Sequence, residues 1–289
     1  MDQAVTLRSI AQGDGECMER GVRTRVIAVS SGKGGVGKTN SVVNLAVAFA
    51  EMGKRVLLLD ADLGLGNLDV LLGLAPRYNL GHLLRNERTM EEVMVKGPSG
   101  IMILPASSGV TELTDLSTEE RLALASHLEN MGAEFDLMII DTGAGISSNV
   151  LFFNIAAQEI VVVVTPEPTS ITDAYALMKV LLRKHGERTF KLLVNQVKSK
   201  KEAVEVYRKI SLAAERFLSV SVDFIGCVLY DENVPKAVVR QQAVMEVYPD
   251  SRASVCYREI AKEISDLPAR AGLKGGMQFF WRQILNRTV

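Results

Sequence analysis

Residues 32–39 read Gly-Lys-Gly-Gly-Val-Gly-Lys-Thr, and this stretch decides the fold. Its spacing matches GxxxxGK followed by Ser or Thr, a loop whose backbone N–H groups cradle phosphates. An apolar run, residues 25–30, precedes it, and a helical stretch, residues 39–52, follows it. Glycine lets the backbone curl around a phosphate, and the start of a helix attracts negative charge. The stretch predicts a strand, a phosphate-binding loop and a helix; a glycine-rich turn without a ligand is the alternative.

The polar residues of this loop have separate chemical tasks. The Lys38 ammonium is expected to reach the β and γ phosphates, and the Thr39 hydroxyl is expected to bind Mg²⁺. ATP and Mg²⁺ are therefore the cofactors that the loop predicts. The expected cofactor-binding residues of the loop are Gly32, Gly34, Gly35, Val36, Gly37, Lys38, Thr39 and Asn40.

Further apolar runs alternate with helical stretches along the chain. The expected strands are residues 25–30, 54–60, 101–105, 137–141, 160–165, 191–195 and 223–229. The expected helices are residues 39–52, 118–131, 147–157, 171–184, 202–219 and 251–267. Apolar strands that alternate with helices are typical of an α/β fold, with a mostly parallel sheet covered by helices on both faces. Such sheets bind ligands at the carboxyl ends of their strands.

Three aspartates lie at or near expected strand ends. Asp60 ends one strand, Asp62 follows two residues later, and Asp141 ends the run Leu137-Met-Ile-Ile-Asp141. A carboxylate there can hold Mg²⁺ directly or through water, although it can equally cap a turn. Three such residues beside one phosphate loop favour a role at the phosphates. The glycines of Gly143-Ala-Gly145 then predict a mobile backbone that senses the γ-phosphate.

Length and composition limit the number of domains and the class of protein. The 289 residues suggest about two domains by length alone. The composition, 47% hydrophobic, excludes disordered, collagen-like and integral-membrane classes of protein. The net charge is −1, so any electrostatic binding must be local. Its three cysteines lack metal-ligand spacing, which suits a reducing cytosol, and we expect no signal peptide or transmembrane helix. The motifs favour one ATPase domain, residues 25–267, between segments 1–24 and 268–289.

Residues 268–276 are an expected linker. The segment that follows it, residues 277–289, has an amphipathic pattern. Its apolar residues share one helical stripe, namely Met277, Phe280, Trp281, Ile284 and Leu285. Two arginines and no acidic residue lie in residues 277–289, whose helix would be about 20 Å long and too short to span a bilayer. The pattern predicts a helix that lies in the interface of an anionic membrane, whereas a tail helix packed on the body is the alternative.

A basic stretch also lies within the body. Residues 179–216 contain 11 Lys or Arg and 4 Asp or Glu, a local charge of +7. Such a stretch can bind phosphates or anionic lipid, and it can equally form solvated helix faces.

Lys33, directly after the first glycine, gives the loop the form called a deviant Walker A motif. With this motif the chain resembles the MinD/ParA class of P-loop ATPases. That resemblance implies an ATP-dependent homodimer in which Lys33 reaches the partner's ATP, with Lys33, Lys38 and Asp62 as catalytic residues and Asp62 positioning the attacking water. It also implies that Thr39, Asp60 and Asp141 serve the metal, the two aspartates through waters. Finally, it implies that Asn195 reads adenine beside Tyr230-Asp-Glu-Asn-Val-Pro235 and that Glu167 faces the dimer partner.

Four motifs narrow the resemblance: residues 37–46, 62–73, 141–147 and 165–175 closely resemble those of the FlhG family, also called FleN or YlxH. These MinD-like ATPases control flagellar number and placement, and the likeness covers about residues 25–267. The start, Asp2-Gln-Ala-Val-Thr-Leu-Arg8, is similar to the family's segment that stimulates an FlhF-type GTPase, which implies roles for Asp2, Gln3, Ala4, Leu7 and Arg8. The resemblance also implies FleQ-type and flagellar C-ring partners, and a cytoplasmic protein that is peripheral at the inner face of the cell membrane as an ATP-bound dimer.

Two other functions compete with this interpretation. A ParA-type segregation ATPase would use the basic stretch to bind nonspecific DNA. A metabolic kinase or ligase would need acceptor-site residues, and none is identifiable. An iron–sulfur carrier of the class is disfavoured because no cysteine lies near Asp141.

Overall fold

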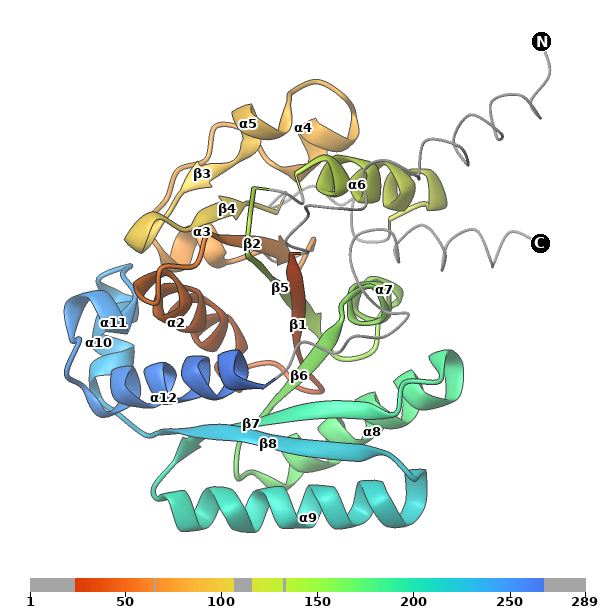
Figure 1. The fold of residues 1–289 in the computed structure, drawn as a ribbon, viewed down its shortest axis with the longest axis vertical. Coiled ribbons are helices and arrows are strands. Elements are labelled where there is room, and N and C mark those ends of the chain that lie inside the picture. The colour runs from red at the N-terminus through yellow and green to blue at the C-terminus, as the bar shows by residue number, and fades with distance from the viewer. Residues whose placement is uncertain (1–23, 65, 107–115, 132–133, 268–289) are drawn as a thin grey trace.

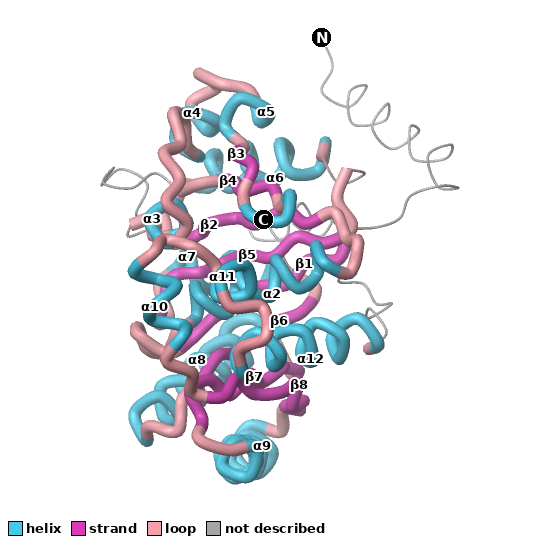
Figure 2. The backbone as a smooth tube through the Cα atoms, turned by 90° about the vertical axis from the view of Figure 1, so that its left-hand side faces the viewer, coloured by secondary structure: helices cyan, strands magenta, loops and turns pink. Residues whose placement is uncertain are grey.

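The computed structural model describes residues 24–64, 66–106, 116–131 and 134–267. In this part of the chain eight strands form one sheet in the order β3-β4-β2-β5-β1-β6-β7-β8. The strands are β1 (Arg25–Ser31), β2 (Val56–Ala61), β3 (Val95–Lys96), β4 (Met102–Leu104), β5 (Leu137–Ala144), β6 (Glu159–Val164), β7 (Thr189–Val197) and β8 (Ser221–Leu229). Figure 2 shows them as a continuous band between helices. All neighbours pair in parallel except β3, which runs antiparallel to β4 at one edge.

Helices cover both faces of the sheet (Figure 1). One face carries α2 (Lys38–Glu51), α10 (Asn233–Val239), α11 (Val244–Val247) and α12 (Arg252–Asp266). The other face carries α4 (Leu80–Leu84), α5 (Met90–Val93), α6 (Thr118–Asn130), α7 (Ser148–Ala156), α8 (Pro168–His185) and α9 (Lys200–Leu218). A short helix, α3 (Leu68–Leu71), follows β2, and a 3₁₀ turn, Pro98–Gly100, precedes β4.

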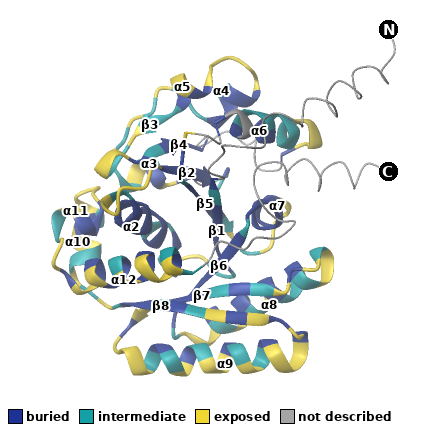
Figure 3. Ribbon diagram, in the orientation of Figure 1, coloured by how far each residue is buried: buried dark blue, intermediate teal, exposed yellow. Residues whose placement is uncertain are grey.

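The central strands are buried on both sides, as Figure 3 shows in dark blue. In β6 every residue is buried, and its alternate side chains enter separate clusters on the two faces. Val161 and Val163 pack towards α2 and α12, whereas Ile160 and Val162 pack towards α7 and α8. A continuous apolar run therefore forms a strand here, because both faces need apolar contacts.

The expected fold class is confirmed, and the expected long elements are present with shifts of a few residues at their ends. The pattern missed the short elements β3, α3, α4, α5, α10 and α11, because two to seven residues carry too few periods to be recognised. Residues Gly143 and Ala144, expected in a mobile loop, instead continue strand β5.

Residues 1–23 and 268–289, which make up all but Thr24 of the two expected terminal segments, lie outside the described residues. They include the GTPase-contacting residues Asp2, Gln3, Ala4, Leu7 and Arg8, and the membrane-contacting residues Met277, Phe280, Trp281, Ile284 and Leu285. Among the helices of the described ranges, none combines the length and apolar character needed to cross a bilayer.

Candidate functional site

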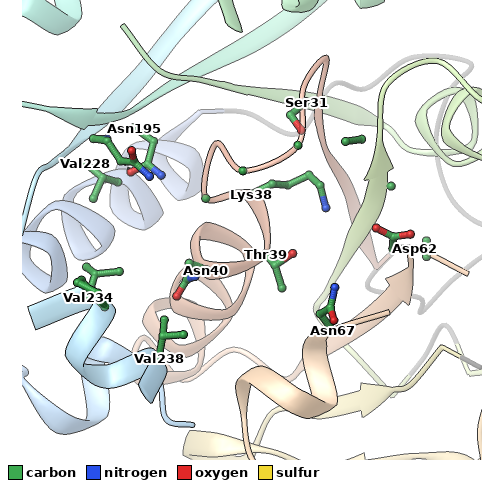
Figure 4. Close-up of a pocket in the computed structure, with 18 of the residues that line it drawn as sticks. Ser31, Lys38, Thr39, Asn40, Asp62, Asn67, Asn195, Val228, Val234 and Val238 are labelled. Atoms are coloured by element: carbon green, nitrogen blue, oxygen red, sulfur yellow. The ribbon is translucent and has the colours of Figure 1, made fainter. Parts of the chain in front are cut away.

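A cavity of about 980 Å³ opens at the carboxyl ends of the strands, around the phosphate loop and the first turn of α2. Figure 4 shows Lys38, Thr39 and Asn40 on one side of it, with Asp62 and Asn67 across from them. The loop and α2 contribute Ser31, Gly34, Gly35, Gly37, Lys38, Thr39 and Asn40. The site thus lies where the sheet topology places a ligand.

Two glycines of the loop are required by close approach. Gly37 precedes α2 in the left-handed region, with φ of 81°, and a Cβ there would lie 2.3 Å from Nδ2 of Asn195. At Gly32 a Cβ would lie 2.2 Å from the backbone carbonyl of Asp173 in α8. The loop is therefore seated directly on β7 and α8, which only glycine permits. Gly32 and Val36 support the loop from behind and are not among the residues that line the cavity.

Asn195, which we expected to read the base, lines the cavity and also braces the loop. Its Nδ2 donates to the carbonyl of Val36 over 2.8 Å, and its Oδ1 accepts from the backbone N–H of Gln196 over 2.9 Å. Gln196 has φ of 58°, and the pairing of β7 with β8 shifts register at this point. Because of this bulge, both amide side chains lie beside Gly37. Gln196 was missed, since a strand pattern predicts that neighbouring side chains point to opposite faces.

Two carboxylates lie side by side behind the cavity. Asp60 of β2 and Asp141 of β5 are register partners, and each is 2% exposed. Burial, together with the nearby Asp141, raises the pKa of Asp60 to about 8. Burial also raises the pKa of Asp141, and the Lys38 ammonium, which forms an ion pair with Asp141, opposes that rise. Two buried acids beside one ammonium resist simultaneous ionisation, and a divalent cation beside them would favour the ionised forms.

The oxygen donors of this corner fit Mg²⁺. The Thr39 hydroxyl lies close enough to Asp141 to oppose the rise in its pKa, and Asp60 faces Asp141 across the strands. Hydroxyl, carboxylate and water oxygens are the ligands that Mg²⁺ takes, and it is usually held by one or two carboxylates with several waters retained. The structure thus brings together the three residues that were expected to serve the metal.

Asp62 is placed at the cavity by Asp60. The two oxygens of Asp60 accept from the N–H groups of Asp62, over 3.2 Å, and Leu68, over 3.3 Å, which closes the intervening segment into a loop. Asp62 itself is half-buried and lines the cavity. A Cβ on Gly143 would lie 3.6 Å from an oxygen of Asp62, so this carboxylate stands beside the end of β5.

The far end of the cavity is apolar and suits a flat base. Of the expected pocket residues, Tyr230, Asp231, Val234 and Pro235 line it. Residues that the sequence pattern did not single out line it as well, namely Val228, Leu229, Val238, Val239 and Tyr257. Those additional residues come from the end of β8, from α10 and from α12. The carboxyl end of β8 was the signal that could have indicated Val228 and Leu229.

Lys33 lies at the exposed rim of the site. Its ammonium is 2.7 Å from a carboxylate oxygen of Glu167 and 3.1 Å from the hydroxyl of Thr169. The side chains of Lys33 and Glu167 are 40% and 63% exposed. In this single chain, the two residues that were expected to meet a partner therefore contact one another.

Part of the basic stretch is neutralised within the chain. Lys191 lies 3.2 Å from the buried carboxylate of Glu159, which also forms a two-point contact with Arg25. Lys200 pairs with Glu259 over 2.9 Å. The stretch therefore presents less free positive charge than its count suggests.

Comparisons with known proteins agree with this site. Residues 24–192 match the profile of the family described as AAA domain. The chain is 43% identical to the antiactivator FleN of Pseudomonas aeruginosa, over 92% of this chain and 95% of FleN. It is 31% identical to the flagellum site-determining protein YlxH of Helicobacter pylori, over 91% and 90% of the two chains.

The fold agrees as well. A structure of the septum site-determining protein MinD of Pyrococcus horikoshii, complexed with Mg-ADP, superposes with a TM-score of 0.70 at 23% identity, covering 87% of this chain and 98% of that one. This likeness shows the fold, while the likeness to FleN and YlxH shows the family. The chain belongs to the FleN and YlxH family of MinD-like P-loop ATPases.

Proposed function

We propose that this ATPase is an ATP-dimerising, membrane-associating switch that regulates the number or placement of flagella. The observation that carries the proposal is the position of Lys33 at the exposed rim of a complete phosphate site. A lysine that only served ATP in its own chain would point into the cavity. A lysine at the rim can cross to a second chain, and it would then join two chains only when ATP is present.

Apart from Lys33, the residues proposed for hydrolysis belong to the chain that binds the ATP. The loop N–H groups and the first turn of α2 hold the phosphates, and Lys38 leaves Asp141 to bind their oxygens. Thr39, Asp60 and Asp141 would hold Mg²⁺, which would supply neutralisation of the charge that develops on the phosphates. Asp62 orients the attacking water, because it is the half-buried carboxylate that lines the cavity beside Asp60 and Gly143. Positioning and charge neutralisation supply most of the catalysis of phosphoryl transfer.

The flagellar role rests on the family of the chain, because the name of one relative, YlxH, states it. FleN is described as an antiactivator, and YlxH is described as flagellum site-determining. The motif Asp2-Gln-Ala-Val-Thr-Leu-Arg8 supports stimulation of an FlhF-type GTPase, and the stripe from Met277 to Leu285 supports attachment to anionic lipid. A single short helix binds a membrane weakly, so two helices in a dimer would make attachment depend on ATP through avidity.

The GTPase role has a direct test on the full chain. Addition of the protein to an FlhF-type GTPase should accelerate GTP hydrolysis, and Gln3→Ala should remove most of that acceleration. Gln12→Ala, a matched glutamine change outside the motif, should leave it intact. Equal stimulation by the wild type and Gln3→Ala would overturn this part of the proposal.

The membrane role is tested by flotation with vesicles that contain anionic phosphatidylglycerol. ATP should increase the bound fraction, and Trp281→Glu should abolish binding while leaving ATP hydrolysis in solution unchanged. Salt-sensitive, ATP-dependent binding to nonspecific DNA without vesicle binding would instead support a ParA-type segregation ATPase.

A further inference from the structure

Three polar side chains form a buried chain of hydrogen bonds directly behind the phosphate site. Ser30 of β1, Thr142 of β5 and Asn154 of α7 are each fully buried. Nδ2 of Asn154 lies 2.7 Å from Oγ of Ser30, and this Oγ lies 2.6 Å from Oγ1 of Thr142. Ser30 comes just before the phosphate loop, and Thr142 comes directly after Asp141. These hydrogen bonds therefore connect the ends of β1 and β5 at the phosphate site to helix α7.

The direction of these bonds follows from counting protons. The amide of Asn154 donates one hydrogen to Ser30 and one to the carbonyl of Val150, 2.7 Å away. Ser30 accepts from Asn154, and Thr142 has carbonyl acceptors of its own, so the arrangement that leaves no hydroxyl hydrogen unpaired has Ser30 donating to Thr142. Thr142 then donates to a backbone carbonyl, that of Gly143 at 2.9 Å or that of Val29 at 3.2 Å. Each amide hydrogen of Asn154 and each hydroxyl hydrogen of Ser30 and Thr142 then has an acceptor, and the last acceptor is a backbone carbonyl beside the phosphate site.

The carbonyl of Gly143 faces β1, because Ser31 of β1 pairs with Ala144 of β5, and the Thr142 hydroxyl contacts it there. This hydroxyl is itself bonded to β1. In a trans peptide the carbonyl and the following N–H point in opposite directions, so the N–H of Ala144 points away from β1. Strand β2 and Asp62 lie on that side, because β5 runs between β1 and β2. Gly143 and Ala144 both line the cavity.

Asn154 carries a cost that an apolar residue would avoid. Within the described part of the chain, its Oδ1 is a buried acceptor without a hydrogen-bond partner. An unpaired buried acceptor lowers stability, so a leucine of similar volume in this position would serve packing alone at least as well. The benefit of the amide therefore lies in what its two donated bonds hold in place.

We infer that Asn154 is a positioning residue for ATP hydrolysis: through Ser30 and Thr142 it sets the orientation of the Gly143–Ala144 peptide beside Asp62. Asn154 does not reach the cavity and acts only through the other two side chains. This inference rests on the proposed catalytic role of Asp62. It implies that the hydrogen-bond chain affects the hydrolysis step and has little effect on nucleotide binding, because the loop that holds the phosphates is braced separately by Asn195.

Isosteric substitutions test the chain of bonds. Asn154→Leu and Thr142→Val should each lower the single-turnover rate of ATP hydrolysis about 10- to 100-fold, while the Kd for a fluorescent ATP analogue changes less than about threefold. Thr142→Ser keeps the hydroxyl and should stay within about threefold of the wild-type rate. The double variant Asn154→Leu with Thr142→Val should be no slower than the slower single variant, because both break the same chain.

A matched control separates this effect from general loss of packing. Thr165 at the end of β6 also has a buried hydroxyl with no partner among the described residues, and it lies outside the cavity lining. Thr165→Val should keep the wild-type hydrolysis rate. Equal losses in Thr165→Val and Thr142→Val would overturn the inference, as would unchanged hydrolysis in Thr142→Val, or additive losses in the double variant.

A separate variant tests the proposed role of Asp62. Asp62→Ala should abolish hydrolysis with ATP still bound. If Asp62→Ala hydrolyses ATP normally, the role of Asp62 fails whatever the other variants do. If Asp62→Ala is inactive while Thr142→Val and Thr142→Ser are equally active, only the positioning role of the hydrogen-bond chain fails.

Discussion

The Lys33 ammonium lies 2.7 Å from a carboxylate oxygen of Glu167 in the same chain, at the rim of the phosphate site. Both side chains are exposed, and such a surface pair contributes about 0–1 kcal/mol. A contact this weak holds the lysine at the rim without locking it there. Lys33 can therefore exchange Glu167 for the phosphates of a second chain at little cost.

Removal of the Lys33 ammonium should separate binding from dimerisation. Lys33→Ala should bind ATP within a few-fold of the wild-type affinity, because Lys38 and the loop N–H groups remain. It should stay monomeric with ATP in light scattering coupled to gel filtration. Lys54→Ala, an exposed lysine that follows α2, provides the control and should dimerise normally. An ATP-dependent dimer of Lys33→Ala would contradict the cross-chain role.

Substitution by alanine should destabilise the protein at one glycine of the phosphate loop and have little effect at another. Gly32→Ala places a Cβ 2.2 Å from the backbone of Asp173, so the loop or α8 must move. We expect a Tm lowered by several degrees and strongly weakened nucleotide binding, since clashes in packed regions cost about 1–3 kcal/mol or more. Gly34→Ala meets nothing within 4 Å and should leave the Tm within about one degree. Equal Tm values for the two variants in calorimetry would argue against the packed loop.

Much of this site could be predicted from local spacing. Residues 32–39 follow a strand and begin a helix, and that order alone locates the phosphates. Asp60 and Asp141 were expected near each other because parallel strands end at the same edge of a sheet. The structure adds that the two are direct register partners, which a single strand pattern does not specify.

Other features depend on tertiary geometry that no local pattern carries. The bulge at Gln196 turns two neighbouring amides to the same side, and α10 and α12 add an apolar wall from over 30 residues further along the chain. Glu167 was expected to face a dimer partner, and in the single chain it holds Lys33. The bonds from Asn154 to Ser30 span 124 residues of sequence.

Asn195 offers a way to distinguish bracing from base reading. Its amide holds the carbonyl of Val36, so Asn195→Asp should place a carboxylate oxygen against a carbonyl oxygen and loosen the loop. If bracing dominates, affinity for ATP and GTP should fall by a similar factor, about 10-fold or more, in isothermal titration. A loss confined to ATP would show instead that Asn195 mainly reads the base. Gln158→Glu, an amide change far from the cavity lining, serves as the control.

Burial of the Cys227 thiol predicts a specific pH dependence. Burial raises the pKa of Cys227 from an ordinary value near 9 to about 11. The folded state therefore keeps this proton at a pH where the unfolded state loses it, so the free energy of unfolding should fall as pH rises from about 9 to 11. Cys227→Ala should flatten that decline in urea titrations. A decline of the same steepness in Cys227→Ala would show that other groups cause it.

The central claim, that ATP joins two chains and Asp62 ends that state, has one direct measurement. Light scattering coupled to gel filtration gives the mass of Asp62→Ala, whose wild-type chain is 31.5 kDa, with saturating ATP and with ADP. The account predicts a stable particle of twice the chain mass with ATP and of one chain mass with ADP, because the variant binds ATP but does not hydrolyse it. A single-chain mass with saturating ATP, or hydrolysis at the wild-type rate, would contradict the account.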